Sequence, residues 1–473
     1  MAPDNQSPSR RLADYLAGLS GKVEDRLLHR ATDALVDTVG CIIQGAGQPW
    51  SQAAIDHALA TGGDGTATVI GADHGPGSPT TPAMAAFANG CSAHGFELDD
   101  VHEEAISHPG AVVVPAALAL AEDRGATNLD LLEAILIGYE AMGRAGIAVG
   151  PAAHMLAGFH PTSMSGVFGS AAAAGRLLGF NGQTMNHAFG IAVSLASGTM
   201  EFASSGGMAK RIHAGRAAEA GLLAASLASR GVEGADDGLA GRYGFCRVFG
   251  VEPELDRLTD GMDSRWMIDE ITVKPYAACS DIHPLIQATA ELQAEHGFDP
   301  AQIIRIEADC PTKAATQNDM DGTASVMAAQ YSAPFNIAAA LLADPSDPAT
   351  YRPEQIAHPA LAELQAKVAP LQPAPEFDRT YAWKMGGRVR VVTAGGEVFE
   401  RTVHGQKGSV HDPLSRPELD AKFERLVDGL APVGTADAIR QALLDRHQPA
   451  AGLLSRNGGG PTPIGGSPFG QAP

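Results

Sequence analysis

Residues 91–121, CSAHGFELDDVHEEAISHPGAVVVPAALALA, place an acidic segment that contains three histidines directly before an apolar run of mostly alanine and valine. The acidic segment ends at His108-Pro109-Gly110, where the apolar run predicts the start of a helix. Pro109 fits the first helical turn, because the N–H that proline lacks has no partner there. His108 is therefore expected at the positive end of a buried helix, where a titratable ring can bind or deprotonate an anionic substrate.

Length and composition bound the class of protein. A chain of 473 residues is too long for one compact core, so two domains are expected. Aromatic residues are scarce and glycine and alanine are abundant, which favours closely packed helices with small contact residues. The net charge of −21 argues against binding to nucleic acid and to anionic membrane surfaces. A small anionic substrate stays compatible with this charge, because a local cluster of basic residues can override the global sign.

The cysteines and the first residues predict a cytoplasmic protein. The five cysteines are far apart and form no CxxC pair, which indicates a reducing compartment and argues against a zinc ribbon or a usual iron–sulfur framework. The first residues, MAPDNQSPSRRLADYL, lack the apolar segment of a signal peptide. The longest apolar run, 111–121, is too short to span a bilayer.

Helical periodicity dominates the first half of the chain. In 25–43, apolar residues recur at spacings of seven, four and three, which places them on one helical face. Helical segments are also predicted from Pro82, over 129–149 and within 163–199, and a short extended segment over 66–71.

Strand patterns appear after residue 268. The segment 268–276 reads as a strand that leads into a turn, and the alternation in 303–310 is typical of a half-buried strand. Residues 387–403 predict two strands joined by a hairpin at Ala394-Gly395-Gly396. With a predicted helix over 325–343, this region forms an α/β module, and the chain returns to a predicted helix over 417–427.

Several long segments, in the same order along the chain, carry a resemblance to the MmgE/PrpD family. They are NGCSAHGFELDD, SHPGAVVVPAALALAE, GFHPTSMSGVFGSAAAAGRLLGF, SGTMEFASSGGMAKRIHAGRAAEAG, RYGFCRVFG, VKPYAACSDIHPLIQA and GSVHDPLSRPELDAKF. The family includes 2-methylcitrate dehydratases, cis-aconitate decarboxylases and iminodisuccinate epimerases. The resemblance implies a mostly α fold, a homodimer, and chemistry that uses neither a metal nor an organic cofactor.

The resemblance also implies how the domains are formed. A large helical domain contains both ends of the chain, a smaller α/β domain is inserted, and the active-site cleft lies between them. The expected bounds are 1–268 and 405–448 for the helical domain and 269–404 for the α/β domain. The Gly/Pro-rich residues 449–473 are expected to form a disordered tail.

The activities of this family share one physical problem, because each breaks a bond at a carbon next to a carboxylate. Negative charge develops on that carbon and spreads onto the carboxylate oxygens. A site for this chemistry needs a base, cations near the developing dianion, and in some cases an acid for a leaving hydroxyl.

Two histidines and a lysine are the main catalytic candidates. Lys210 follows a Gly-Gly pair in a basic run, which on spacing alone is more often a solvated turn than a site. His160 precedes Pro161, so its backbone is expected to be extended, although a lone histidine is more often structural. The resemblance favours catalytic roles for His160, Lys210 and His108.

Further residues are candidates for binding the substrate. Lys274 can close over an anion or form a surface ion pair, and Arg211 or Arg216 can grip a remote carboxylate with a guanidinium fork. Glu97 or Asp99 can supply an acid that touches the substrate. A metal site remains a minority interpretation of the same acidic segment, with ligands from His94, Asp99, Asp100, His102 and His108.

The chain departs from the decarboxylase-like members of the family near these residues. Glu97 and Val101 stand where aspartate and threonine are expected, and the segment before His108 is one residue longer. Cys279 replaces a histidine, with His283 one turn further on, and Phe335 replaces a tyrosine. The loss of two proton donors weakens the case for dehydration more than for epimerisation.

The sequence therefore predicts a cofactor-independent lyase or isomerase that acts on a small di- or tricarboxylate. The expected mechanism is proton transfer next to a carboxylate, with His108 and His160 as acid and base and with Lys210 and Lys274 stabilising the dianion. A 2-methylcitrate dehydratase-like reaction ranks first, an epimerase of a dicarboxylate such as iminodisuccinate second, and cis-aconitate-type decarboxylation third. A carboxylate-binding protein without activity is the alternative from another class.

Overall fold

The computed structural model of the chain describes residues 6–71, 78–150, 157–202, 207–381, 383–431 and 433–451. These residues form two compact units, the first within 1–96, 107–269 and 426–473 and the second within 97–106 and 270–425. The prediction of a mostly α protein is confirmed. The domain bounds predicted above stay predictions. Of the tail predicted to be disordered, residues 452–473 lie outside the described residues.

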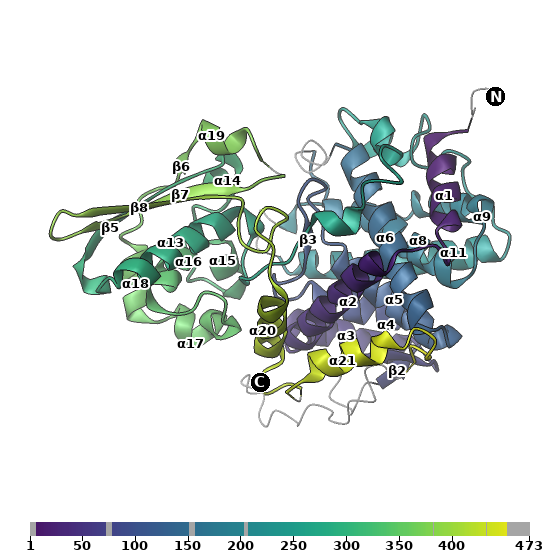
Figure 1. Cartoon of the computed structure of the whole chain (residues 1–473), viewed down its shortest axis with the longest axis horizontal. Helices are drawn as coiled ribbons and strands as arrows, with labels where there is room; N and C mark the ends of the chain where they lie inside the picture. Colours follow the sequence, from purple (N-terminus) through teal and green to yellow (C-terminus); the bar gives the residue numbers. More distant parts are fainter. Residues whose placement is uncertain are drawn as a thin grey trace. The chain divides into compact units, whose positions relative to one another are not determined.

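The first unit is built mainly from helices (Figure 1). The helices predicted over 25–43, from Pro82 and over 129–149 are confirmed, and the stretch 163–199 contains two helices, α8 and α9. Two short strands, β1 (Ala67–Val69) and β2 (Ser78–Thr80), pair antiparallel. The described helices are α1 (Pro8–Gly18), α2 (Asp25–Ala46), α3 (Pro49–Thr61), α4 (Pro82–Ala93), α5 (Gly110–Arg124), α6 (Asn128–Ala148), α8 (Pro161–Leu177), α9 (Gly182–Ala192), α11 (Ala209–Ser229), α12 (Phe245–Phe249) and α21 (Thr435–Leu444).

Small residues let the helices that carry the site approach one another closely. Helix α8 packs against α6, α5 and α11, and α11 packs against α4. At the α4–α11 crossing, a Cβ on Gly215 would lie 2.2 Å from the carbonyl oxygen of Phe87, and a Cβ on Gly90 would lie 2.8 Å from the Cα of Gly215. Real Cβ atoms do not come this close, so both positions require glycine. The abundance of glycine and alanine in the sequence therefore has a packing function.

The second unit combines a four-stranded sheet with short helices. Its strand order is β6-β5-β7-β8, and only the β5–β6 pair is parallel. A separate two-residue pair joins β3 (Val101–His102) to β4 (Ile271–Thr272). The remaining elements are α13 (His283–His296), β5 (Ile303–Cys310), α14 (Thr312–Gln317), α15 (Val326–Tyr331), α16 (Ala333–Leu342), α17 (Pro353–Ile356), α18 (Pro359–Gln365), β6 (Gln372–Pro373), α19 (Pro375–Asp378), β7 (Gly386–Thr393), β8 (Val398–His404) and α20 (Arg416–Val427).

The strands predicted over 66–71, 303–310 and 387–403 are confirmed. The segment 268–276 is a strand only at Ile271–Thr272, after a 3-10 helix over Met267–Glu270, and one helix prediction is wrong. β5 matches 303–310, β7 and β8 form the predicted hairpin, and Gly396 in its turn has a φ of +82°. The segment 325–343 is not one helix but two, α15 and α16, because Ser332 is extended and caps the second helix. Pro334 explains the break, because it has no N–H to continue the hydrogen bonds of α15, whereas the first turn of α16 needs none at that position.

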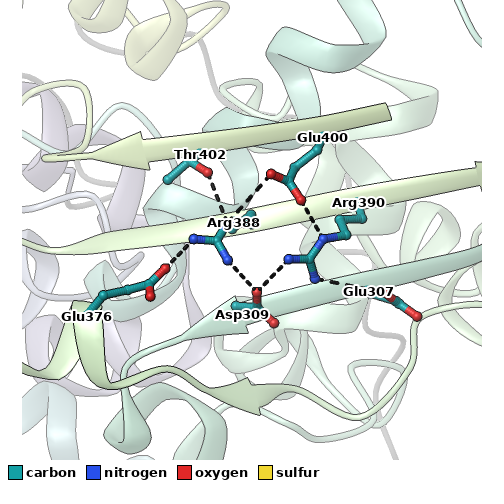
Figure 2. Close-up of polar contacts among 7 residues, drawn as sticks. All are labelled: Glu307, Asp309, Glu376, Arg388, Arg390, Glu400 and Thr402. Carbon is teal, nitrogen blue, oxygen red and sulfur yellow. Dashed lines mark hydrogen bonds and ion pairs between the residues drawn. The ribbon is translucent and has the colours of Figure 1, made fainter. Parts of the chain in front are cut away.

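The two faces of the sheet differ in character. Val389 and Val391 of β7 are buried on the face toward α13, which packs on β7 and β8 (Figure 1). Arg388 and Arg390 alternate with them and form ion pairs across the strands (Figure 2). We call this group the arginine ladder: Glu307, Asp309, Glu376, Arg388, Arg390, Glu400 and Thr402.

The cysteines and the apolar helices were the basis of two further expectations. All five cysteines lie in the described ranges, and each is a buried free thiol. Among the described residues, no helix combines the length and apolar character that a membrane span requires.

Candidate active site

Three helices of the first unit carry the main predicted residues at their N-terminal ends. His108 and Pro109 directly precede α5, and Pro109 already has helical backbone angles, φ −65° and ψ −39°. His160 is the N-cap residue of α8 with φ −87° and ψ 109°, so the extended backbone predicted before Pro161 is confirmed. Lys210 lies in the first turn of α11. Partial positive charge at helix N-termini favours anions at all three places.

Four imidazole rings, from these elements and from the C-terminal end of α4, lie next to one another in space. We call them the histidine row. The ring centroids of His108 and His94 are 4.9 Å apart, those of His94 and His160 are 5.8 Å apart, and those of His160 and His213 are 5.1 Å apart. Nδ1 of His160 lies 3.0 Å from Nδ1 of His213, which is hydrogen-bond distance. The structure therefore brings the two predicted histidines together through His94.

Lys210 and the histidines of the row differ in their exposure to solvent. Lys210 is 4% exposed and His160 is 5% exposed, while His108 and His213 are half-buried. A solvated basic turn, the competing interpretation of Lys210, is therefore wrong. Burial lowers the pKa of His160 well below its usual value, and His94, Lys210, His213 and His108 lower it further. Burial and then Lys210 also lower the pKa of His213.

Backbone and aromatic groups fix the rings in place. The backbone N–H of His108 donates to Oγ1 of Thr162 at 3.2 Å, and that of His160 donates to the carbonyl of Gly198 at 3.2 Å. The ring of Phe202 meets His160 and His213 edge-on, with centroids 5.5 and 5.7 Å away. These contacts hold His160 and His213 in a largely buried setting, where an anion would raise their affinity for protons.

The two candidate arginines lie in different environments. Arg211 is 1% exposed, donates to the carbonyl of His94 at 3.0 Å and lies over the ring of Trp50. It thus supports the C-terminal end of α4, where a cation is favoured. The side chain of Arg216 is 46% exposed and pairs with Glu219. For both arginines, a role in gripping a substrate carboxylate stays a prediction.

In the second unit, Lys274 forms an ion pair with Glu97. Nζ of Lys274 lies 3.2 Å from Oε2 of Glu97, and both side chains are 1% exposed. The surface ion pair considered for Lys274 is therefore wrong about its environment. Glu97 has a φ of +59° and Ile106 a φ of +48°, so the segment 97–106 carries left-handed backbone at both ends. Such strain in residues other than glycine is concentrated at functional sites.

The other candidates in the second unit are also buried. His283 is the first residue of α13, and its Nε2 lies 3.1 Å from the carbonyl oxygen of Ala278. Burial, and then the charge of Lys274, lowers the pKa of His283 to about 3. Burial raises the pKa of the Cys279 thiol to about 11. Phe335 is fully buried in α16, and Asp99 is buried in the segment 97–106.

Some residues with polar contacts in these clusters were not predicted to act in proton transfer. His213 was noted only as part of a basic run, and His94 only as a metal ligand. Tyr351 packs against Phe335, donates from its hydroxyl to Oδ1 of Asn336 at 2.6 Å, and has its pKa raised by burial and by Glu97. Of these three, only His213 had a usable signal, its spacing of three from Lys210, which puts both on one side of a helix.

Comparison with known proteins agrees with this arrangement. Residues 10–258 match the MmgE/PrpD N-terminal domain, and residues 276–447 match the MmgE/PrpD C-terminal domain. The chain belongs to the MmgE/PrpD family. The family predicted from the sequence is therefore confirmed.

Relatives of this MmgE/PrpD protein include named enzymes. The cis-aconitate decarboxylase of Aspergillus terreus is 29% identical over 440 residues, 88% of each chain. The human cis-aconitate decarboxylase is 29% identical over 434 residues, 88% of this chain and 87% of the relative. A cis-aconitate decarboxylase-like protein of Aspergillus oryzae is 32% identical over 284 residues, 57% of this chain and 58% of the relative. The MmgE/PrpD chain is an enzyme of the lyase class, one of the two classes, lyase or isomerase, that the sequence predicted.

Proposed function

We propose that the protein is a lyase that acts on a small tricarboxylate and passes through a carbanion next to a carboxylate. The observation that carries this proposal is the histidine row beside the buried Lys210, in which burial lowers the pKa of His160 and of His213. Neutral imidazoles accept or donate protons at neutral pH, and a buried ammonium stabilises charge that spreads onto carboxylate oxygens.

In the proposed mechanism, the substrate binds with a carboxylate toward Lys210. Cleavage of a bond at the neighbouring carbon leaves an electron pair there, and Lys210 stabilises the resulting dianion. His160 or His108 then protonates the carbon, or removes its proton in the reverse sense. Lys274 stays a candidate for a second contact to the substrate, and its pairing with Glu97 keeps its ammonium in a fixed place.

Among the outcomes predicted from the sequence, we favour decarboxylation of an unsaturated tricarboxylate such as cis-aconitate. Support comes from the relatives, because those compared above are named cis-aconitate decarboxylases or cis-aconitate decarboxylase-like. This changes the order derived from the sequence, which placed dehydration first. Buried Phe335 and Cys279, where the resemblance implies tyrosine and histidine, keep a related substrate or an epimerase reaction as outcomes of the test.

Proton NMR in deuterated water tests the proposal. The protein is incubated separately with cis-aconitate, citrate, 2-methylcitrate and iminodisuccinate. We expect deuterium at the carbon next to a carboxylate, together with loss of carbon dioxide from cis-aconitate. Turnover of citrate or 2-methylcitrate would indicate a dehydratase, and exchange without net loss of iminodisuccinate would indicate an epimerase.

Absence of both exchange and turnover with all four acids would contradict the proposal and favour a carboxylate-binding protein without activity. A parallel incubation with a chelator tests the metal interpretation, since the rings of His94 and His108 are close enough to share one cation. We expect no change in rate. The homodimer and the cytoplasmic location stay predictions, and light scattering after size-exclusion chromatography checks the first of them.

A further inference from the structure

His213 lies beside His160 in the histidine row and shares a hydrogen bond with it. The two Nδ1 atoms lie 3.0 Å apart, so one ring donates a hydrogen and the other accepts it. A neutral imidazole carries one hydrogen, on either Nδ1 or Nε2. Whichever ring donates through Nδ1 therefore leaves its own Nε2 without hydrogen, and the acceptor carries its hydrogen on Nε2.

We propose that His213 is a positioning residue that donates its Nδ1–H to Nδ1 of His160 and so keeps a hydrogen on Nε2 of His160. This inference rests on the proposed function, because protonation of a carbanion requires His160 to act as an acid. With the opposite arrangement, Nε2 of His160 would carry only a lone pair and could not protonate carbon.

The same hydrogen bond supplies the proton that replaces the one given away. When the Nε2–H of His160 goes to carbon, the Nδ1–H of His213 moves to Nδ1 of His160, and Nε2 of His213 takes a proton from water. Both rings stay neutral throughout. After product release, water protonates Nε2 of His160, its Nδ1–H returns to His213, and His213 gives its Nε2–H to solvent, which restores the starting tautomers.

The surroundings of the pair suit this transfer. His160 is buried, whereas His213 is half-buried, so solvent reaches His213 more readily than it reaches His160. The ring of Phe202 meets both imidazoles edge-on and covers them. Gly198 has a φ of +117°, and a Cβ there would lie 2.6 Å from Oγ of Ser163 and 3.4 Å from Cε1 of His213. A side chain at position 198 would clash with Ser163 and strain the backbone, so glycine preserves the segment whose carbonyl accepts from the N–H of His160.

Burial lowers the pKa of both rings of the pair, and charged neighbours lower it further. Lys210 acts on both rings, and His94 and His108 act on His160 as well. A second positive charge in this group is unfavourable, so transfer of a proton between two neutral rings is preferred over storage of a proton on one of them.

Two substitutions at position 213 separate positioning from packing. In His213→Asn, the side-chain amide can still donate to Nδ1 of His160 but cannot pass a proton on. In His213→Ala the donor is lost, and the half-buried location lets added imidazole enter. His187→Ala, at a half-buried histidine of α9 in the same unit, is the matched control.

The first measurement is nitrogen-15 NMR of the imidazoles without substrate. We expect a hydrogen on Nε2 of His160 in the unsubstituted protein, in His213→Asn and in His187→Ala, and a mixture of tautomers in His213→Ala. A hydrogen on Nδ1 of His160 in the unsubstituted protein, or an unchanged tautomer in His213→Ala, would overturn the proposal. Because no turnover is needed, this result is independent of the proposed function.

The second measurement is turnover. We expect kcat to fall about 100-fold in His213→Ala and about 10-fold in His213→Asn, with KM within about twofold, because only proton transfer is affected. Added imidazole should restore at least about tenfold in His213→Ala and nothing in His213→Asn. A His213→Ala enzyme with kcat like that of the control, or a loss that imidazole does not reverse, would overturn the relay. No turnover by the unsubstituted protein would instead contradict the proposed function.

Discussion

The histidine row and the arginine ladder gather basic side chains in opposite ways. In the ladder, Arg388 forms ion pairs with Asp309, Glu376 and Glu400, while Arg390 pairs with Glu307, Asp309 and Glu400 (Figure 2). The hydrogen bond from Arg390 to Glu400 raises the pKa of that arginine. The ladder thus stabilises the charged form of Arg390.

In the row, burial and neighbouring bases lower the pKa of His160. The charged form is disfavoured there until an anion arrives. A cluster of basic residues therefore does not by itself locate a site, since the ladder also contains two arginines. What distinguishes them is that carboxylates pair with Arg388 and Arg390, whereas burial and neighbouring basic groups lower the pKa of His160.

Lys210 gives the largest expected effect on this comparison. We expect Lys210→Met to lower the rate of deuterium exchange about 10³-fold, because the ammonium that stabilises the dianion is lost while the apolar stem is kept. NMR measures the rate, and a circular-dichroism melt shows that the protein is folded. An exchange rate equal to that of the unsubstituted protein would remove Lys210 from the mechanism.

The buried pair in the second unit tests whether pairing within the protein also matters away from solvent. We expect Lys274→Met to lower the free energy of unfolding by roughly 3 kcal/mol, because Glu97 then stays buried without its ammonium partner. The double variant with Glu97→Gln should recover part of this loss, and urea denaturation of the three variants gives the coupling. Additive effects would mean that the pair contributes no coupling.

Glu103 offers a third arrangement, a buried carboxyl that receives hydrogen bonds from neutral groups. Its Oε1 accepts from Oγ1 of Thr272 at 2.5 Å and from Nε2 of Gln406 at 2.6 Å. Burial raises its pKa to about 7, although both hydrogen bonds act in the opposite direction, and Asp281 raises the pKa further.

Because the folded state holds this proton more tightly than the unfolded state, its contribution is complete below about pH 4.5 and is lost as the pH rises through about 7. The loss amounts to roughly 3 kcal/mol at most. Melting temperatures measured from pH 5 to 8 should fall for the unsubstituted protein and change less for Glu103→Gln. Parallel curves for the two proteins would contradict this reasoning.

The arginine ladder should give the smallest effect. We expect Arg390→Gln to change the free energy of unfolding by less than about 1 kcal/mol and to leave the exchange rate unchanged, because partly solvated ion pairs contribute little. Raising the salt concentration should reduce even this difference. A loss of exchange comparable to that in Lys210→Met would contradict the distinction between the arginine ladder and the histidine row.

The sequence predicted elements whose pattern is local. Helix α2 follows from regular apolar spacing, and the β7–β8 hairpin follows from alternation around Gly395-Gly396. The break at Ser332 between α15 and α16 was not predicted, although Pro334 is a sequence signal for it. Such local signals are sufficient for elements but not for the contacts between them.

The site was predicted only in part for the same reason. His108, His160 and Lys210 were found through the resemblance, whereas the hydrogen bond between His160 and His213 joins positions 53 apart and has no local signature. Arg211 and Arg216 are five residues apart on α11, a rotation of about 140°. Helical geometry alone thus shows that they lie on different sides of α11, and the structure buries the first and exposes the second.

The crossing of α4 and α11 at Gly90 and Gly215 has a consequence for engineering. Main-chain atoms of the two helices meet at this crossing, and Gly90 and Gly215 each present a hydrogen atom there in place of a side chain. This close contact sets the spacing between the end of α4 and the start of α11. One added methyl group at position 215 would displace a whole helix end, with its lysine and its histidine together. A library aimed at new substrates should therefore leave this crossing intact and vary side chains that can be exchanged one at a time.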